Sequence, residues 1–152
     1  MNFSADVGTV SKEIRAYVEL LKPRLSLLVA FSCGFGNILA TSGSIDWFRL
    51  SLILCGGFLL SGASVTINQV IEIKEDGLMN RTMNRPLPTG RVSVTSAVSF
   101  ALVIMAISLW LLYLSTNPLT VGLSVLSMGL YSFVYTPLKK VGPVAVLSLI
   151  HI

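Results

Sequence analysis

Four long runs of apolar residues dominate the chain, and each approaches the length of a membrane-spanning helix. They cover residues 25–40, 48–70, 93–114 and 119–135. A helix needs about 20 apolar residues to cross a hydrocarbon core about 30 Å thick, so the first run is marginal. Glycine and serine within the runs suit close helix packing in lipid. The pattern predicts an all-α, polytopic membrane protein with about four transmembrane helices.

Composition supports this class. Hydrophobic residues make up 53% of the chain and charged residues only 12%, whereas about 25% of a soluble domain is charged. The mean hydropathy is +0.80. We expect one membrane domain over residues 25–152, preceded by a separate segment over residues 1–24. Cys33 and Cys55 lie within apolar runs, where they indicate neither a disulfide framework nor a metal site.

The eleven basic residues alternate between the two sides of the predicted membrane helices. Counted before, between and after the four runs, they number 4, 1, 4, 0 and 2. The positive-inside rule converts this alternation into a cytoplasmic N-terminus and a cytoplasmic segment 68–90. We therefore expect a multi-pass protein of the inner (plasma) membrane. The net charge of +4 follows from topology, predicts no nucleic-acid partner and needs only membrane lipid to interact with.

The segment over residues 1–24 has the pattern of a short amphipathic helix that lies at the membrane surface. Its apolar positions alternate with charged ones: Ile14, Tyr17, Val18, Leu20 and Leu21 stand among Glu13, Arg15 and Glu19. Helices of this kind bury one face in the headgroup region. Pro23 is then expected to turn the chain into the membrane. The charges do not precede a cleavage site, so the pattern does not indicate a cleavable signal.

The most polar part of the chain separates the second and third apolar runs and reads NQVIEIKEDGLMNRTMNRPLPTG. Asn68, Glu72 and Asp76 are four residues apart, so a helix would place them on one side as a stripe about 12 Å long. Gly77 is expected to end that helix in a left-handed conformation. Arg81 and Arg85 follow, and prolines then predict an irregular loop.

These residue types together suggest a site for a metal-bound diphosphate. Carboxylate and amide oxygens, as in Asn68, Glu72 and Asp76, are ligands that Mg²⁺ accepts while substrate phosphates complete its shell. Arginine side chains, as in Arg81 and Arg85, bind phosphate oxygens with two parallel donors. An alternative is that the charges pair among themselves at the headgroup level, where burial costs little. Spacing alone leaves both interpretations open.

The same segment resembles a known family. Its motif residues are similar to the first aspartate-rich motif of the intramembrane prenyltransferases of the UbiA superfamily: Asn68, Glu72, Asp76, Met79, Arg81, Thr82, Arg85, Pro86 and Leu87. With YVELLKPRLSLLV before the first run and YTPLKK after the fourth, the chain most resembles the haem-farnesylating branch of that superfamily. The resemblance covers residues 17–140, and three separated segments match by chance less readily than one motif does.

This resemblance implies a reaction and a set of roles. A farnesyl group would pass from farnesyl diphosphate to a vinyl group of haem B, giving haem O, with Mg²⁺ as cofactor. Matching positions assign the metal and the diphosphate to the following residues: Asn68, Glu72 and Asp76 as catalytic metal ligands, Arg81 and Arg85 on the diphosphate, and Lys22, Arg24 and Lys139 as further candidates for the same anion. Glu72 stands where many members have aspartate, and Glu75 lies off the stripe.

The implied chemistry agrees with the residue types. Metal and arginine stabilise the departing diphosphate, so that the C–O bond can ionise toward an allylic carbocation. Apolar helices shield that cation from water and hold the prenyl chain.

The length of the chain departs from the family pattern. The resemblance implies a ring of about nine transmembrane helices with a second acidic motif in its later half, whereas four runs stand here. We interpret residues 25–152 as a partial prenyltransferase domain, from a truncated or frame-shifted reading frame, and expect the isolated chain to be inactive. His151, the sole histidine, is interpreted as an accidental residue of the atypical ending rather than a haem ligand.

Two alternatives remain at this stage. One is a quinone or lipid prenyltransferase of the same superfamily, since the acidic motif is shared. The other is a non-catalytic four-span membrane protein, in which the polar residues are structural or face a partner.

Overall fold

The computed structural model describes the backbone of residues 3–141 and the side chains of residues 7–138. All regular structure in this part is helical, and four helices are long and apolar enough to cross a membrane. The predicted fold class is confirmed. In chain order the elements are α1 (Phe3–Leu21), α2 (Pro23–Ala40), α3 (Trp47–Ile71), α4 (Ile73–Leu78), α5 (Val94–Ser115), α6 (Pro118–Gly129), the π-helix η1 (Leu130–Tyr135) and α7 (Thr136–Val141).

Local sequence accounts for where the long helices begin. The side chains of Asp46, Ser93 and Asn117 each accept a hydrogen bond from a backbone N–H in the first turn of α3, α5 and α6, respectively. Such caps satisfy donors that have no partner within the helix. Proline occupies the first position of α2 and of α6, where its missing N–H costs nothing.

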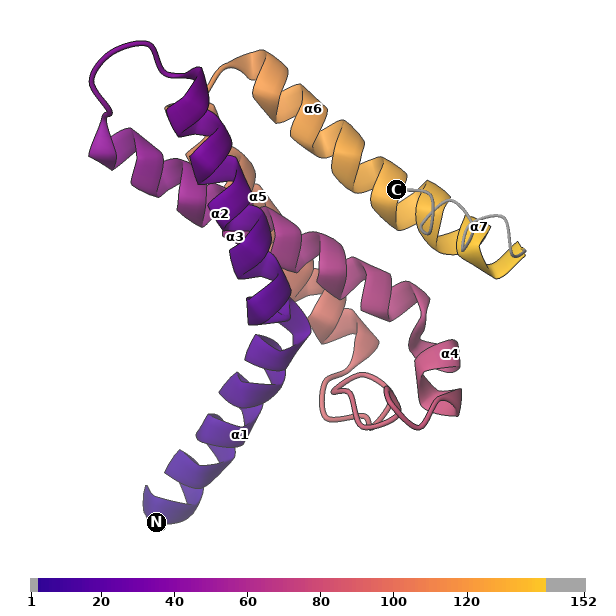
Figure 1. Cartoon of the computed structure of the whole chain (residues 1–152). Helices are drawn as coiled ribbons and strands as arrows, with labels where there is room; N and C mark the ends of the chain where they lie inside the picture. Colours follow the sequence, from indigo (N-terminus) through magenta and orange to yellow (C-terminus); the bar gives the residue numbers. More distant parts are fainter. Residues whose placement is uncertain (1–2, 142–152) are drawn as a thin grey trace.

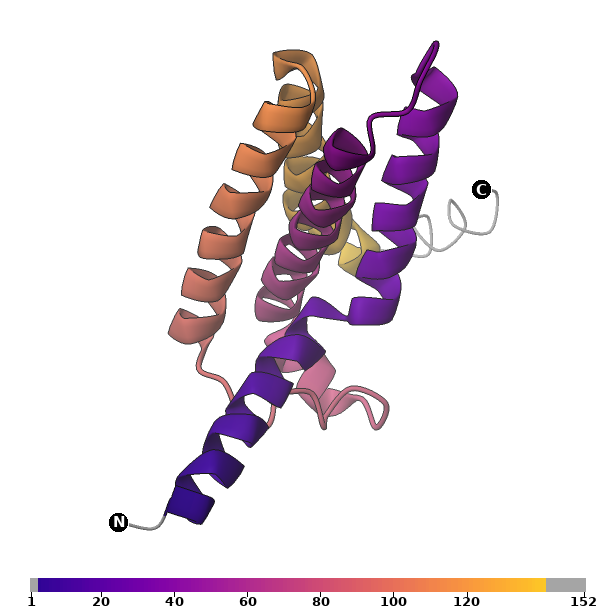
Figure 2. The ribbon, with the colours of Figure 1, turned by 90° about the vertical axis from the view of Figure 1, so that its left-hand side faces the viewer.

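The bundle is built around α3, which packs against α2 on one side and α5 on the other (Figures 1 and 2). Glycine on α3 allows neighbouring helices to approach closely: a Cβ atom at Gly56 would lie 2.9 Å from the Leu112 side chain of α5, and one at Gly62 would lie 2.6 Å from the Leu21 side chain of α1. The Ser108 hydroxyl donates a 2.7 Å hydrogen bond to the carbonyl of Gly56. Small residues and hydroxyls thus hold α3 in place, as lipid-embedded helices require.

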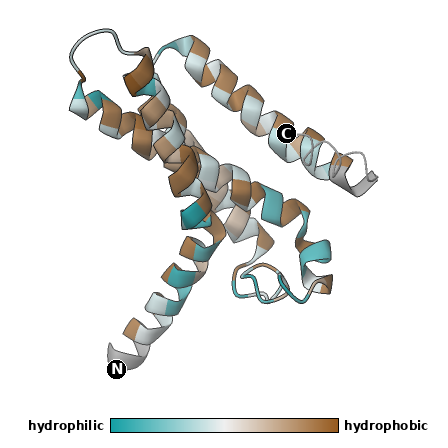
Figure 3. Cartoon of the chain, in the orientation of Figure 1, coloured by the Kyte–Doolittle hydropathy of each residue, from teal (hydrophilic) through white to brown (hydrophobic). Residues whose placement is uncertain are grey.

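The bundle has two unlike ends. Figure 3 shows hydrophilic residues gathered on α1, on α4 and along residues 79–93, all at one end, which we call the charged end. Residues 41–46 and 116–117 form the turns at the opposite end. Among the residues that the structure describes, Arg49 is the one basic residue at that end, and its Nε donates to the carbonyl of Ser115.

The loop over residues 79–93 at the charged end packs against the helices. Leu87 and Val92 are buried against Leu20 of α1 and Ala97 of α5. A 3.0 Å ion pair between Arg91 and Glu19 ties the loop to α1. The backbone of α1 is tied to α3 as well, because the carbonyl of Leu20 accepts a 2.8 Å hydrogen bond from the Gln69 amide. The loop and α1 therefore close this end of α3 on two sides.

The outer part of α1 carries an exposed row of apolar side chains. Val7, Val10, Ile14 and Val18 are each about half exposed and fall on one side of the helix. This is the surface expected of an amphipathic helix. Its position at the membrane surface stays a prediction.

One local prediction is wrong. Gly77 lies inside α4 and does not end a helix in the left-handed conformation. The regular α-helix is interrupted earlier, at Glu72 (φ −97°, ψ 12°), and α4 ends at Leu78, after which Met79 has extended backbone. Because the chain leaves the helix through extended rather than left-handed geometry, no glycine is required. The left-handed glycine of this segment is Gly90 (φ +72°).

We expect Gly56→Ala to destabilise the bundle by about 1–3 kcal/mol, because the new methyl group overlaps Leu112 in a packed interface. The matched control is Gly122→Ala on α6, where a Cβ atom meets nothing within 4 Å. That change should be neutral or stabilising by up to about 1 kcal/mol, since alanine favours helix. Unfolding of both variants in mixed micelles measures the difference. Equal stability of the two would refute the close approach of α3 and α5.

Candidate functional site

The predicted stripe lies where α3 meets α4. Asn68 belongs to the last turn of α3, Glu72 forms the junction, and Asp76 lies in α4. The hydrogen bonds from Glu72 N to Asn68 O (3.0 Å) and from Asp76 N to Glu72 O (2.8 Å) keep the helical register across the junction. The three residues are only 6%, 9% and 4% exposed. Burial of two carboxylates at a bilayer edge is costly unless they are compensated.

Asn68 and Glu72 form one compensated pair. The Asn68 amide nitrogen Nδ2 donates a 2.9 Å hydrogen bond to Glu72 Oε2. On its other side, Asn68 Oδ1 accepts a hydrogen bond from the hydroxyl of Thr136, the first residue of α7. The amide therefore connects the carboxylate at the junction of α3 and α4 to a hydroxyl 68 residues further along the chain from Asn68.

Asp76 and Arg85 form the second pair. The Arg85 guanidinium donates to Asp76 Oδ2 at 2.6 Å, and the two side chains are 25% and 6% exposed. The short distance is typical of a charge-assisted hydrogen bond. Thr82 is buried nearby, and its hydroxyl donates a 2.8 Å hydrogen bond to the carbonyl of Asp76. The loop thus folds back, and its second arginine, Arg85, pairs with the last residue of the stripe.

The other predicted site residues lie outside these pairs. Arg81 is exposed, and within the described residues its side chain makes no hydrogen bond to the stripe. Lys22 forms the junction between α1 and α2 in a left-handed conformation (φ +45°), and Arg24 beside it is exposed. Glu75 is half-buried. Lys139 belongs to α7, but its side chain lies outside the described residues, as does His151 altogether.

The donor set fits Mg²⁺ bound together with a substrate phosphate. Among the described residues, no three His, Cys, Asp or Glu side chains stand close enough to form a protein cage for a metal. Mg²⁺ does not need such a cage, because it is usually held by one or two carboxylates while phosphates and waters supply the remaining ligands. Glu72 and Asp76 can provide that pair of hard oxygen ligands.

Sequence reasoning gives the threonines of this site no role: Thr82 is named only as a motif residue, and Thr136 is not singled out. Thr82 and Thr136 are both almost fully buried and hydrogen-bonded to stripe residues. Both lie in the segments RTMNRPLP and YTPLKK that carried the family resemblance. Neither polarity nor spacing marks a threonine as a site residue, because its hydroxyl is as common in packing as in function.

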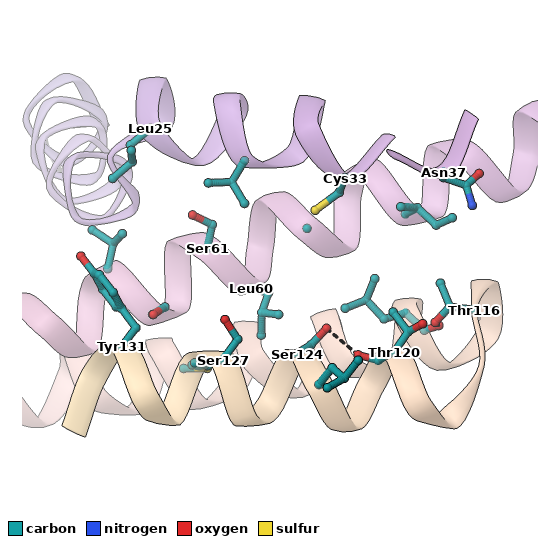
Figure 4. A pocket seen from close by; sticks show the side chains of 18 residues that line it. Leu25, Cys33, Asn37, Leu60, Ser61, Thr116, Thr120, Ser124, Ser127 and Tyr131 are labelled. Carbon is teal, nitrogen blue, oxygen red and sulfur yellow. Dashed lines mark hydrogen bonds between the residues drawn. The ribbon is translucent and has the colours of Figure 1, made fainter. Parts of the chain in front are cut away.

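An apolar cavity of about 740 Å³ lies between the helices that lead to the site. It lies between α2, α3 and α6 and is drawn in Figure 4, with Leu25 and Tyr131 toward the charged end and Asn37 and Thr116 toward the opposite end. Its volume falls within the range of about 300–1,000 Å³ usual for ligand pockets. The α3 residues that line it run from Ile53 to Val65, which is about 18 Å of helix. Val65 precedes Asn68 by about one turn, so the lining of the cavity stops one turn before the stripe begins.

Comparison with known proteins decides the family. The model of the UbiA prenyltransferase family matches residues 28–150. The chain belongs to the UbiA prenyltransferase family. No solved structure matches it.

Curated relatives within the UbiA family are similar to most of this chain. The protoheme IX farnesyltransferase of Cytophaga hutchinsonii is 45% identical over 90% of the chain and 48% of its own length. The mitochondrial protoheme IX farnesyltransferase of Arabidopsis thaliana is 44% identical over 86% of the chain and 30% of its own length. The protoheme IX farnesyltransferase of Colwellia psychrerythraea is 41% identical over 90% and 45%, respectively. The chain spans at most about half the length of these relatives.

We expect Arg85→Met to lower stability by about 1–3 kcal/mol, because it leaves the Asp76 carboxylate buried without its cation. The matched control is Arg81→Met, which removes an exposed arginine from the same loop and should change stability by less than about 0.5 kcal/mol. In an Asp76→Asn background, Arg85→Met should cost much less. Unfolding in mixed micelles gives all four values, and equal losses for the two arginines would contradict the pairing.

Proposed function

We propose that this chain provides the diphosphate-binding site of a Mg²⁺-dependent prenyltransferase that moves a farnesyl group from farnesyl diphosphate to a vinyl group of haem B, giving haem O. The observation that carries the proposal is the placement of Glu72 and Asp76. Both carboxylates are buried at the charged end of α3, Asp76 is paired with Arg85, and the lining of an apolar cavity comes within one helical turn of Asn68.

The charge pattern supports an anionic ligand that carries a divalent cation. Glu72 and Asp76 would hold Mg²⁺, which when bound neutralises diphosphate charge and stabilises it as a leaving group. Arg85 contacts Asp76 through one of its nitrogens, and a guanidinium has five N–H donors in a planar fork. Its other donors can therefore bind diphosphate oxygens while the pair with Asp76 is kept.

The cavity supports a prenyl group as the other half of the substrate. A diphosphate at the stripe directs its attached chain along α3 into the apolar space that Val29, Leu60 and Leu123 line. When the C–O bond breaks, its electron pair leaves with the diphosphate and a positive charge develops on the allylic carbon. The apolar walls exclude water, which would otherwise capture that carbon.

The identity of the acceptor depends on the relatives. Those compared above are named protoheme IX farnesyltransferases, and this favours haem over a quinone or lipid acceptor. For the membrane orientation, the positive-inside rule supports a cytoplasmic charged end, and thus a cytoplasmic N-terminus, in the inner membrane. Arg49 is the one basic residue at the opposite end of the described bundle.

The binding step can be tested on the chain itself in lipid nanodiscs. We expect it to bind the unreactive analogue farnesyl thiodiphosphate only when Mg²⁺ is present. Glu72→Gln and Asp76→Asn should each weaken that binding by at least about tenfold, because each removes a metal ligand. The matched control is Glu13→Gln, an exposed glutamate on α1, which should bind as the unaltered chain does. Binding without Mg²⁺, or unchanged binding in both site variants, would exclude the proposed roles.

Two cysteines provide an independent test of the cavity. Cys33 lines it and Cys55 does not, although both are accessible on membrane helices. In single-cysteine variants, Cys55→Ser and Cys33→Ser, Mg²⁺ and farnesyl thiodiphosphate should slow labelling of Cys33 by a membrane-permeant maleimide and leave labelling of Cys55 unchanged. Labelling of Cys33 that the analogue does not affect would show that the prenyl chain lies elsewhere.

A further inference from the structure

We infer that Thr136 is a positioning residue for this site: acting through Asn68, it fixes the hydrogen bond that orients the Glu72 carboxylate. The inference rests on the proposed function, since the orientation of Glu72 matters for holding a cation. Nothing in the chemistry of prenyl transfer alone requires a threonine at the start of α7.

The contacts of Thr136 place it behind the metal-binding side chains rather than among them. The residue is 0% exposed. Its hydroxyl is hydrogen-bonded to Asn68 Oδ1 and lies 3.0 Å from the carbonyl oxygen of Tyr131. A hydroxyl buried without a partner costs free energy; the single proton of this hydroxyl has an acceptor in Asn68 Oδ1, and the Tyr131 carbonyl oxygen is a competing acceptor.

The direction of the hydrogen bonds follows from the chemistry of the groups. An ionised Glu72 carboxylate can only accept, so Asn68 must turn its NH₂ group toward Glu72. The amide oxygen of Asn68 then faces Thr136 and can only accept, so the Thr136 hydroxyl must donate. The two hydrogen bonds therefore run in one direction: Thr136 donates to Asn68, and Asn68 donates to Glu72. Rotating the Asn68 amide by half a turn would set two acceptors against each other.

This series of hydrogen bonds changes the role expected for Asn68. Its oxygen accepts the hydrogen bond from Thr136, and its nitrogen donates to Glu72. Asn68 then acts through Glu72, and the metal ligands from this chain are the two carboxylates. Partners that orient a ligand in this way typically contribute about 10–100-fold to metal affinity.

The π-helix η1 explains how Thr136 reaches Asn68. The elements α6, η1 and α7 form one continuous span, and η1 contacts α3. The Thr136 hydroxyl approaches the carbonyl five residues earlier, at Tyr131, which matches the spacing of a π turn. Thr136, the residue that follows this turn, contacts Asn68 of α3. Because Tyr131 also lines the cavity, one irregular turn contacts both the cavity and the polar site.

The test measures how much Mg²⁺ the chain needs to bind farnesyl thiodiphosphate in nanodiscs. Thr136→Val, which keeps the shape but lacks the hydroxyl, should raise the half-saturating Mg²⁺ concentration by about 10–100-fold. Thr136→Ser keeps the hydroxyl and should restore it. The matched control is Ser132→Ala, which removes a buried hydroxyl one turn away that has no hydrogen-bond partner among the described residues. It should leave the Mg²⁺ requirement unchanged.

The outcomes separate this inference from the function on which it rests. If the unaltered chain binds the analogue with Mg²⁺ and Thr136→Val needs no more Mg²⁺ than it does, the positioning role is refuted and the diphosphate site stands. If the serine variant is as impaired as the valine variant, the hydroxyl is not the cause and the inference is again refuted. Absence of Mg²⁺-dependent binding in the unaltered chain refutes the proposed function instead.

A second measurement needs no folded Thr136 variant and no bound ligand. In the unaltered chain labelled with ¹⁵N-asparagine, the Asn68 side-chain signal is assigned by its loss in Asn68→Ser. One of its two amide hydrogens should exchange slowly with water, before and after Mg²⁺ and pyrophosphate are added, because it stays hydrogen-bonded to Glu72. Fast exchange, or protection lost when Mg²⁺ and pyrophosphate bind, would show that the amide does not hold Glu72.

Discussion

The cost of burying two carboxylates at the end of a membrane-spanning helix determines how the charged end of this protein is built. Glu72 and Asp76 are almost inaccessible, and each has a different compensation. The Glu72 carboxylate accepts a hydrogen bond from the Asn68 amide in the last turn of α3. The Asp76 carboxylate forms an ion pair with Arg85 of the following loop. A buried ion pair rarely adds stability over an apolar alternative. The presence of these buried charges is therefore explained better by a role in ligand binding than by a contribution to folding stability.

The apolar part of the fold supports this arrangement. Glycines on α3 allow α2 and α5 to approach closely, whereas α6 diverges until η1 returns to α3 at the charged end. The divergence leaves the cavity, and the return brings Thr136 to Asn68. The same four helices thus provide an apolar space and a polar end to it. That combination matches an amphiphilic substrate with a long apolar chain and a diphosphate head.

Much of the fold and half of the site could be predicted from the sequence, for identifiable reasons. Hydropathy locates the helices. A capping residue such as Asp46 binds backbone N–H groups only two or three residues away, so its effect depends on local sequence alone. Which of two arginines four residues apart pairs with the stripe depends on how the loop packs; the structure selects Arg85 and leaves Arg81 exposed. The partner of Asn68, Thr136, depends on the irregular turn of η1, which no periodicity indicates. Gly77 was misjudged because glycine permits a helix end without requiring one.

The central claim is that Glu72 and Asp76 bind one divalent cation together with a diphosphate. Replacing Mg²⁺ with paramagnetic Mn²⁺ allows a direct measurement, because electron-nuclear double resonance detects the nuclei next to the ion. With pyrophosphate and a chain whose aspartate and glutamate carboxyls carry ¹³C, we predict ³¹P and ¹³C couplings on the same Mn²⁺, with the ¹³C signal reduced in Glu72→Gln and in Asp76→Asn. A spectrum with ³¹P coupling alone, identical in the unaltered chain and both variants, would contradict the account.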